Sequence, residues 1–274
     1  MTKSIFSMEN VSVSYGESQV LSDVSFTINS IAETTSGNSG QLTALLGANG
    51  SGKTTLLKVI CNQLPHTGSC HLEDTVLEKL SLRKRAQKIS YIPQRSGITI
   101  SISVLDVVLM GYNPSLKLLE YPSGQMRQEA LEALDTVGLL GFSDRDYLTL
   151  SEGEKQLCIF ARTLIEHTQL LLLDEPDSAL DFRNRCHMMK TLRHLTDQYH
   201  KMAILCLHDP GLALDYCDQL VLLSDGTVSA VLHPKTDTLE SMEQALSVIY
   251  GPVTLIRTAD SRGVDHLVLL SNLI

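Results

Sequence analysis

Short apolar runs alternate with amphipathic segments along most of the chain, and this alternation predicts an α/β fold. The apolar runs that we interpret as buried strands lie at 42–46, 170–173, 203–207 and 220–223. The segments with apolar residues three and four positions apart, which predict helices, lie at 55–60, 154–166, 183–199 and 210–216. Because strands that alternate with helices pair in parallel, we expect one parallel sheet that is covered on both faces.

The opening segment, residues 5–28, follows a different pattern, with polar and apolar positions alternating in short stretches. This pattern predicts strands at 5–8, 11–15 and 24–28, broken at 16–18 and 22–23, which form an antiparallel sheet at the edge of the molecule. A polar stretch at 29–41 predicts a mobile surface loop. Further strands are predicted at 68–72 and 89–93, with a short basic turn or helix at 81–87 between them.

Residues 103–140 change to a helical pattern, which Asn113-Pro114 and the stretch 121–124 interrupt, and this predicts an inserted helical subdomain. A helix at 239–250 and strands at 253–257 and 266–270 follow near the C-terminus. We therefore expect a single domain over 1–274. Its predicted parts are a core with the β subdomain at 1–97 and 156–235, a helical subdomain at 98–155, and a C-terminal segment at 236–274.

Composition narrows the possible partners and the compartment. A net charge of −9 and a pI near 5.4 argue against broad binding to nucleic acid or anionic lipid, so no nucleic-acid partner is expected. The six cysteines form no C-x-x-C pair, which predicts reduced thiols rather than disulfides or a metal site. The chain contains neither an uncharged apolar stretch of about 18 residues nor a secretory leader pattern, which predicts a soluble protein.

A complete phosphate-binding loop motif, G-x-x-x-x-G-K-[ST], occupies residues 47–54, between a predicted strand and a predicted helix. Its glycines allow successive backbone N–H groups to converge on a polyphosphate, and the following helix adds the positive end of its dipole. Lys53 is placed to meet the outer phosphates, and Thr54 offers a hydroxyl to Mg²⁺. The motif predicts a nucleotide site, with ATP and GTP both open on these residues alone.

Two adjacent carboxylates, Asp174 and Glu175, follow the apolar run at 170–173. Ligands of open α/β sheets collect at the carboxyl ends of the strands, so the pair is expected at the nucleotide site. Adjacent strand residues point to opposite sides, and we therefore predict different roles for the two carboxylates. Asp174 approaches the Mg²⁺ shell, and Glu175 acts as the general base for the attacking water.

Further motifs resemble those of the ATP-binding cassette ATPases. The sequence Leu-Ser-Glu-Gly-Glu-Lys-Gln at 150–156 is similar to the signature motif of that family, usually Leu-Ser-Gly-Gly-Gln. Tyr15 matches the adenine-stacking aromatic, Gln94 the Q-loop, residues 178–181 the D-loop, and His208 the switch histidine. The resemblance covers nearly the whole chain. It implies a P-loop NTPase (RecA-like) α/β core with an antiparallel β edge subdomain and an inserted helical subdomain.

The resemblance also implies ATP and Mg²⁺ as ligands and assigns a role to each matching residue. The implied catalytic residues are Glu175, His208, Gln94 and Lys53. The nucleotide contacts expected from the loop and the other motifs are Tyr15, Gly47, Asn49, Gly50, Ser51, Gly52, Lys53, Thr54, Thr55, Ser151, Gly153, Glu154 and Asp181. The implied Mg²⁺ ligands are Thr54, Gln94 and Asp174.

Ser151 and Gly153 open a predicted helix, and a helix N-terminus of this kind binds anions. The resemblance implies that they hold the γ-phosphate of a nucleotide seated on another subunit, so that ATP joins two copies head to tail. Two residues depart from the usual signature, because Glu152 replaces its first glycine and Glu154 its glutamine. Negative charge at Glu152 is expected to weaken ATP-bridged closure, whereas Glu154 suits a position that accepts ribose hydroxyls.

The segments 98–116 and 249–256 resemble those of ATPases that power import of iron-siderophore complexes, haem and cobalamin. This resemblance implies a cytoplasmic subunit that is peripheral on the inner face of the cell membrane. Its implied partners are a second ATPase copy, transmembrane permease subunits and an extracytoplasmic substrate-binding protein. The alternatives are an ATPase of another transporter class, or a non-transport or regulatory nucleotide-binding cassette.

Overall fold

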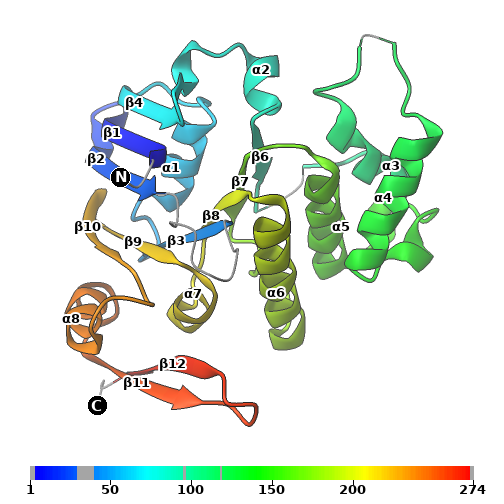
Figure 1. Ribbon diagram of the computed structural model, residues 1–274. Coiled ribbons are helices and arrows are strands. Elements are labelled where there is room, and N and C mark those ends of the chain that lie inside the picture. Colours follow the sequence, from blue (N-terminus) through cyan, green and yellow to red (C-terminus); the bar gives the residue numbers. More distant parts are fainter. Residues whose placement is uncertain (1–3, 30–39, 95–96, 118, 272–274) are drawn as a thin grey trace.

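The computed structural model describes residues 4–29, 40–94, 97–117 and 119–271 (Figure 1). Its strands form a six-stranded sheet, a four-stranded sheet and a two-stranded hairpin. The loop predicted at 29–41 lies mostly outside the described residues. None of the helices in these four ranges has the length and apolar character that crossing a membrane requires.

The six-stranded sheet has the strand order β10-β9-β3-β8-β7-β6, and every neighbouring pair except β9 and β10 is parallel. The strands are β3 (Gln41–Gly47), β6 (Ile89–Ile92), β7 (Leu170–Asp174), β8 (Met202–Cys206), β9 (Gln219–Ser224) and β10 (Thr227–Leu232). The parallel sheet that the apolar runs predicted is thus confirmed. The antiparallel edge strand β10 was not predicted.

Two hydrophobic cores cover the two faces of this sheet. Along β7, Leu171 and Leu173 face one core, and Leu170 and Leu172 face the other. The first core is completed by helices α3 (Val104–Leu109), α4 (Gly124–Thr136), α5 (Glu152–Ile165), α6 (Phe182–Tyr199) and α7 (Pro210–Tyr216). The second is completed by helix α1 (Lys53–Ile60) and the antiparallel sheet. Burial on both faces explains why these strands are apolar without alternation.

The antiparallel sheet has the order β2-β1-β4-β5 and lies beside α1 in Figure 1. Its strands are β1 (Ser4–Tyr15), β2 (Ser18–Asn29), β4 (Thr67–Leu72) and β5 (Thr75–Val76). The predicted breaks after residue 8 and at 22–23 are wrong. Asn10 and Asp23 have positive φ values of 52° and 50°, and the strands continue through them with irregular register.

The helical insert lies beyond β6 and contains helices α3 (Val104–Leu109) and α4 (Gly124–Thr136), which pack against α5 (Glu152–Ile165). The interruptions at 113–114 and 121–124 separate α3 from α4, as predicted. Short helix α2 (Leu82–Ala86) is joined to the insert by Arg83, whose guanidinium donates to the carbonyls of Pro114 and Leu116 at 3.2 and 2.7 Å. The short 3-10 helices are η1 (Leu77–Lys79), η2 (Met110–Tyr112), η3 (Leu140–Phe142) and η4 (Tyr147–Thr149).

Near the C-terminus, helix α8 (Leu239–Tyr250) leads into the hairpin of β11 (Val253–Ala259) and β12 (Asp265–Ser271). The helix has the bounds that the sequence predicted. The hairpin packs on α8 and α7, away from the helical insert (Figure 1).

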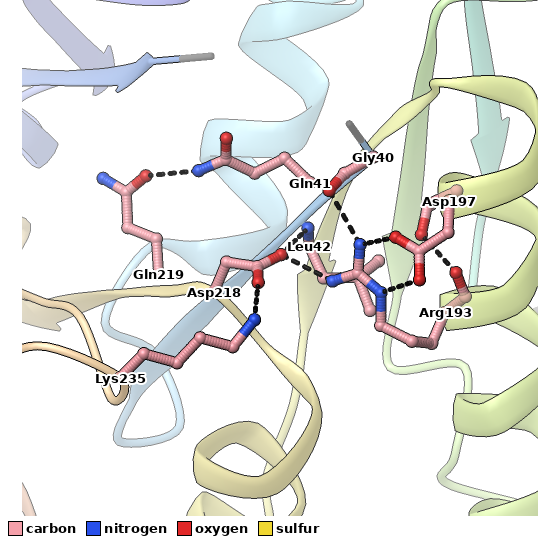
Figure 2. A network of polar contacts seen from close by, with 9 residues as sticks. Gly40, Gln41, Leu42, Arg193, Asp197, Asp218, Gln219 and Lys235 are labelled. Carbon is pink, nitrogen blue, oxygen red and sulfur yellow. Dashed lines mark hydrogen bonds and ion pairs between the residues drawn. The ribbon is translucent and has the colours of Figure 1, made fainter. Parts of the chain in front are cut away.

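A polar network fixes the beginning of β3, the strand whose other end carries the phosphate-binding loop (Figure 2). The buried carboxylate of Asp218 accepts hydrogen bonds from the Leu42 amide at 3.0 Å and from the Arg193 guanidinium, and it pairs with Lys235 at 2.7 Å. Arg193 also pairs with Asp197. The network connects the beginning of β3 to α6 and to the segments that precede β9 and follow β10. It therefore fixes the position of β3 in the sheet.

Candidate functional site

The carboxyl ends of β3, β7 and β8 meet at one edge of the central sheet. Leu45 pairs with Cys206, and Asp174 also pairs with Cys206, so the ends of the three strands are in register. Parallel strands direct the segments that follow them to the same edge. The phosphate-binding loop, the acidic pair and His208 follow these strands and are thereby brought together.

The phosphate-binding loop requires its glycines for two reasons. Gly50 and Gly52 have φ values of 82° and 100°, a region that residues with a Cβ rarely adopt. A Cβ on Gly47 would lie 2.4 Å from the Leu223 carbonyl oxygen. The loop therefore turns tightly into α1, as the motif predicted.

Lys53 begins helix α1 and is 6% exposed. Its ammonium group donates to the carbonyl oxygens of Gly47 at 2.8 Å and of Ala48 at 3.0 Å. These contacts hold the ammonium group across the loop. A polyphosphate bound there can replace the two carbonyl oxygens as the acceptor of its hydrogen bonds.

A cavity of about 550 Å³ opens over this loop. Its lining residues are Tyr15, Val20, Asn49, Gly50, Gly52, Lys53, Thr54, Thr55, Glu175 and His208. Tyr15 is 49% exposed at the end of β1, so its ring is available to a ligand. Ten positions from five separate segments thus share one cavity, and nine of them are residues that the sequence predicted.

Asp174 points toward the phosphate-binding loop. Its carboxylate accepts hydrogen bonds from the Thr54 hydroxyl at 2.9 Å and from the Tyr91 hydroxyl at 3.3 Å. Burial and the neighbouring carboxylate raise the pKa of Tyr91, which therefore remains a donor. The Thr54 and Asp174 oxygens are hard donors, the kind that Mg²⁺ prefers, so their pairing fits a magnesium site.

Glu175 contacts two other side chains, Gln94 and His208. Its carboxylate accepts a hydrogen bond from the Gln94 amide at 2.6 Å and lies 2.8 Å from His208 Nε2. Its φ of 49° places the backbone in the left-handed region, which is uncommon for glutamate. The two carboxylates thus have different partners, as predicted, but the cause is the turn of the backbone at Glu175, because strand alternation applies only to an extended chain.

The signature residues lie apart from this cavity, and none of them is among the residues that line it. Ser151 caps α5, and its amide and hydroxyl donate to the Glu154 carboxylate at 2.7 and 2.8 Å. The hydrogen bond from the Ser151 amide, followed by that from its hydroxyl, lowers the pKa of Glu154. Glu152 pairs with Lys155 at 2.8 Å on the exposed surface.

Gly153 lies beside the D-loop, and Asp181 is the last residue of that loop. A Cβ on Gly153 would lie 3.4 Å from the Ala179 carbonyl oxygen, and Asp181 caps α6 by accepting from the Asn184 amide at 2.8 Å. The start of α5 and the D-loop therefore form one surface, separate from the cavity that contains Lys53.

Two residues of the site were not predicted from the sequence. Val20 lines the cavity from β2, and the Tyr91 hydroxyl reaches Asp174 from β6. Neither residue belongs to a motif. Tyr91 could have been found from the expectation that the predicted strands at 89–93 and 170–173 are neighbours, since a strand tyrosine near the same sheet edge can reach the acidic pair.

The parallel sheet with its strand–glycine loop–helix unit defines the class of the protein, a P-loop α/β protein with a helical insert and an antiparallel β subdomain. The family model described as ABC transporter matches residues 32–178. The chain belongs to the ABC transporter family.

Relatives and solved structures agree with this assignment. The hemin import ATP-binding protein HmuV of Bordetella pertussis is 35% identical over 239 residues, covering 84% of this chain and 86% of the relative. The fold matches a subunit of an inward-facing transporter described as metal-chelate type, with a TM-score of 0.79, 24% identity and coverage of 98% and 99%. It also matches a bacterial ABC transporter cassette in a dimeric structure, with a TM-score of 0.72, 25% identity and coverage of 84% and 98%.

Proposed function

We propose that this chain is the ATP-hydrolysing subunit of an ABC importer and that two copies bind ATP between them. The observation that carries the proposal is the carboxylate of Glu175, held by Gln94 and His208 at the mouth of the cavity that contains Lys53. A general base must lie within hydrogen-bond reach of the water that it activates. A carboxylate beside the phosphate loop can meet that condition.

The loop residues bind the phosphates through their backbone N–H groups, and Lys53 exchanges its carbonyl partners for the β- and γ-phosphates. Tyr15 stacks on the adenine ring. Gln94 orients the attacking water or the metal ion, and His208 donates to the γ-phosphate as charge develops there. In this assignment the contacts with Gln94 and His208 hold the Glu175 carboxylate beside the position of the γ-phosphate.

Thr54, Asp174 and Gln94 would hold Mg²⁺. When bound, Mg²⁺ neutralises charge on the β- and γ-phosphates. The hydrogen bond between Thr54 and Asp174 keeps the two side chains together, and the Tyr91 hydroxyl donates to the second carboxylate oxygen.

A second copy completes the site. Ser151, Gly153 and Glu154 lie outside the cavity of their own chain, which is expected if they contact nucleotide on the partner's phosphate loop. Asp181, at the N-terminus of α6, would face the same interface. The dimeric structure of the bacterial cassette supports this pairing.

The permease would be driven through the helical insert, from the cytoplasmic side of the membrane, with a substrate-binding protein on the other side. Tyr121, in the insert, is 86% exposed, and Leu82 of α2, the helix that Arg83 joins to the insert, is 79% exposed, so both side chains are accessible to a partner. The relative named as a hemin import protein favours haem as the substrate, within a group that includes iron-siderophore complexes and cobalamin. A transporter of another class, or a regulatory cassette without transport, is the alternative.

The decisive experiment is Glu175→Gln. Loss of the general base should lower the ATPase rate at least about a hundredfold, while ATP binding is retained and an ATP-bound dimer accumulates. Rates, nucleotide affinity and light scattering measured on the purified protein provide the three readouts. Glu132→Gln, on the exposed face of α4, serves as the matched control.

If the Glu175→Gln protein hydrolyses ATP at the parental rate, the assignment of the base is wrong. If the parental protein itself binds ATP without hydrolysing it, the regulatory alternative is favoured. Transport assays with haem, a ferric siderophore and cobalamin, in vesicles that contain the co-purified permease, then distinguish the substrates.

A further inference from the structure

Three side chains of metal-ligating type meet in the antiparallel β subdomain, at a distance along the chain from the nucleotide motifs. A His66 ring nitrogen, the Cys70 sulfur and a Glu78 carboxylate oxygen all lie within 4.8 Å of one another. We infer that this cluster is a binding site for a divalent transition-metal ion, with Zn²⁺ as the ion that its donors fit best.

The cluster is built from three neighbouring segments. His66 precedes β4, Cys70 lies within β4, and Glu78 lies in η1, which follows β5. Because β4 and β5 pair through the tight turn at Glu73, the chain returns beside itself and brings Glu78 next to Cys70. The sheet, and not a sequence motif, therefore assembles the donors.

The histidine is oriented as a ligand. His66 Nδ1 lies 2.8 Å from the Leu64 carbonyl oxygen, and Nε2 lies 3.2 Å from Glu78 Oε1. A backbone carbonyl on one ring nitrogen is the contact that fixes ligating histidines in metal sites, because it leaves the other nitrogen directed at the ion. The side chain is 3% exposed, so the ring has little freedom to turn away.

The glutamate is held in place and still has one oxygen available. Glu78 Oε1 accepts a hydrogen bond from the Cys70 amide at 2.8 Å, which keeps the carboxylate beside the thiol. Glu78 Oε2 is buried and has no hydrogen-bond partner among the described residues. A buried polar atom without a partner costs free energy, and a bound cation would offset that cost.

The donor set indicates the ion. One imidazole nitrogen, one thiolate sulfur and one carboxylate oxygen are the three ligand types that Zn²⁺ takes, and a water completes four-coordination. The Glu78 side chain is 25% exposed, whereas its Oε2 atom is buried. Mg²⁺ prefers oxygen ligands, so the cluster differs in chemistry from the Thr54 and Asp174 pair.

Binding would release the Cys70 thiol proton to solvent and would join β4 to η1 and to the segment that leaves α1. Helix α1 begins in the phosphate-binding loop, so the ion would brace the far end of that helix. A ligand that binds only the folded state raises its stability by mass action. The site is therefore expected to stabilise the β subdomain, and it is independent of the proposed ATPase function.

The test is metal binding to the purified, nucleotide-free full chain, with excess Mg²⁺ present to occupy oxygen sites. Zn²⁺ is titrated in competition with a chromophoric chelator, and Co²⁺ is titrated separately while its thiolate charge-transfer absorption is recorded. We expect one ion per chain, a cobalt–thiolate band and a higher melting temperature with Zn²⁺. His66→Gln and Cys70→Ser should each weaken Zn²⁺ binding by at least about tenfold.

Matched controls come from the same region and the same residue types. His71→Gln removes the neighbouring histidine of β4, whose ring contacts Ser69, and Cys186→Ser removes a half-buried thiol elsewhere; both should bind Zn²⁺ like the parental chain. Glu78→Gln keeps the acceptor for the Cys70 amide and provides a ligand variant that should fold if Cys70→Ser does not. Absence of stoichiometric binding, or equal binding by His66→Gln, Glu78→Gln and the parental chain, would overturn the inference.

Discussion

The acidic side chains of the signature segment are bound within their own helix. Glu154 forms a reciprocal capping box with Ser151, and Glu152 pairs with Lys155 three residues later. Both carboxylates complement the positive end of the α5 dipole. The contacts engage the Ser151 hydroxyl as a donor to Glu154, so a phosphate that binds there must replace Glu154 as its acceptor.

This arrangement leads to a prediction for Glu152→Gly. Removal of a negative charge beside a bridging triphosphate should tighten ATP-dependent dimerisation by about two- to fivefold at low salt, since exposed charge interactions contribute about 0.3–1 kcal/mol. Light scattering in the Glu175→Gln background, where ATP is not consumed, measures the effect. Glu132→Gly provides the control, and unchanged or weaker dimerisation of the Glu152 variant would reject the idea.

Nine of the ten residues that line the cavity could be predicted because each belongs to a motif with fixed neighbours, whereas Val20 belongs to none. The different partners of Asp174 and Glu175 do not follow from strand alternation, because the left-handed φ of Glu175 takes that residue out of the extended conformation. If β6 and β7 are taken as neighbours, Tyr91 can be placed near the acidic pair, but its hydrogen bond to Asp174 depends on the register of the two strands, which the sequence does not specify. The contacts of Glu175 with Gln94 and His208 likewise depend on the conformation of the loops that carry these residues, and the spacing of the motifs in the sequence does not specify that conformation.

The elements of the antiparallel sheet illustrate where local sequence signals mislead. The turn-forming pair Ser22-Asp23 was predicted to break a strand, and the predicted strands also left a gap at residues 9–10, yet both strands are continuous. In the folded chain the Asn10 side chain donates to the Asp23 carboxylate at 2.7 Å, across the irregular pairing of β1 and β2. The left-handed conformation is thus accommodated as a bulge, and the strand continues beyond it.

The left-handed conformation of Asn10 predicts different effects for two substitutions at this position. Asn10→Val places a β-branched side chain at φ 52° and removes the bond to Asp23, which should lower the free energy of unfolding by about 1–3 kcal/mol. Asn10→Gly permits the same backbone conformation and should cost much less. Urea unfolding followed by circular dichroism measures both. Similar losses for the two variants would show that backbone conformation is not the cause.

Strand β10 was missed for a different reason. Its residues alternate only weakly, with Val231 and Leu232 as adjacent apolar positions, and the segment is too short for periodicity to decide. The signal that could have located it is the turn Asp225-Gly226, whose residues have φ values of 47° and 74°. An Asp-Gly pair after a predicted strand is a strong indication of a hairpin.

At the scale of the whole molecule, the predicted nucleotide contacts fall into two separate groups. Tyr15, Lys53 and Glu175 line one cavity, whereas Ser151 and Glu154 lie at the start of α5, outside it. The sequence could place each group on its element, because strand ends and helix starts are local features. Their separation within one chain is a property of the tertiary fold, and it is the reason that a second copy is needed in the proposed site.

A mixing experiment tests that need directly. Each proposed site combines the phosphate loop of one chain with the signature segment of the other. Lys53→Ala should disable every site to which the variant chain supplies the phosphate loop, and Ser151→Ala every site to which the variant chain supplies the signature segment. Each variant alone should therefore be nearly inactive. A mixed head-to-tail dimer contains one site with both defects and one with neither. Random pairing at equal concentrations makes half of the dimers mixed, so the ATPase rate should recover to at most about a quarter of the parental rate. If each chain instead hydrolysed ATP within its own cavity, mixing would give only the average of the two variants, because no exchange of partners could restore Lys53 to one or Ser151 to the other.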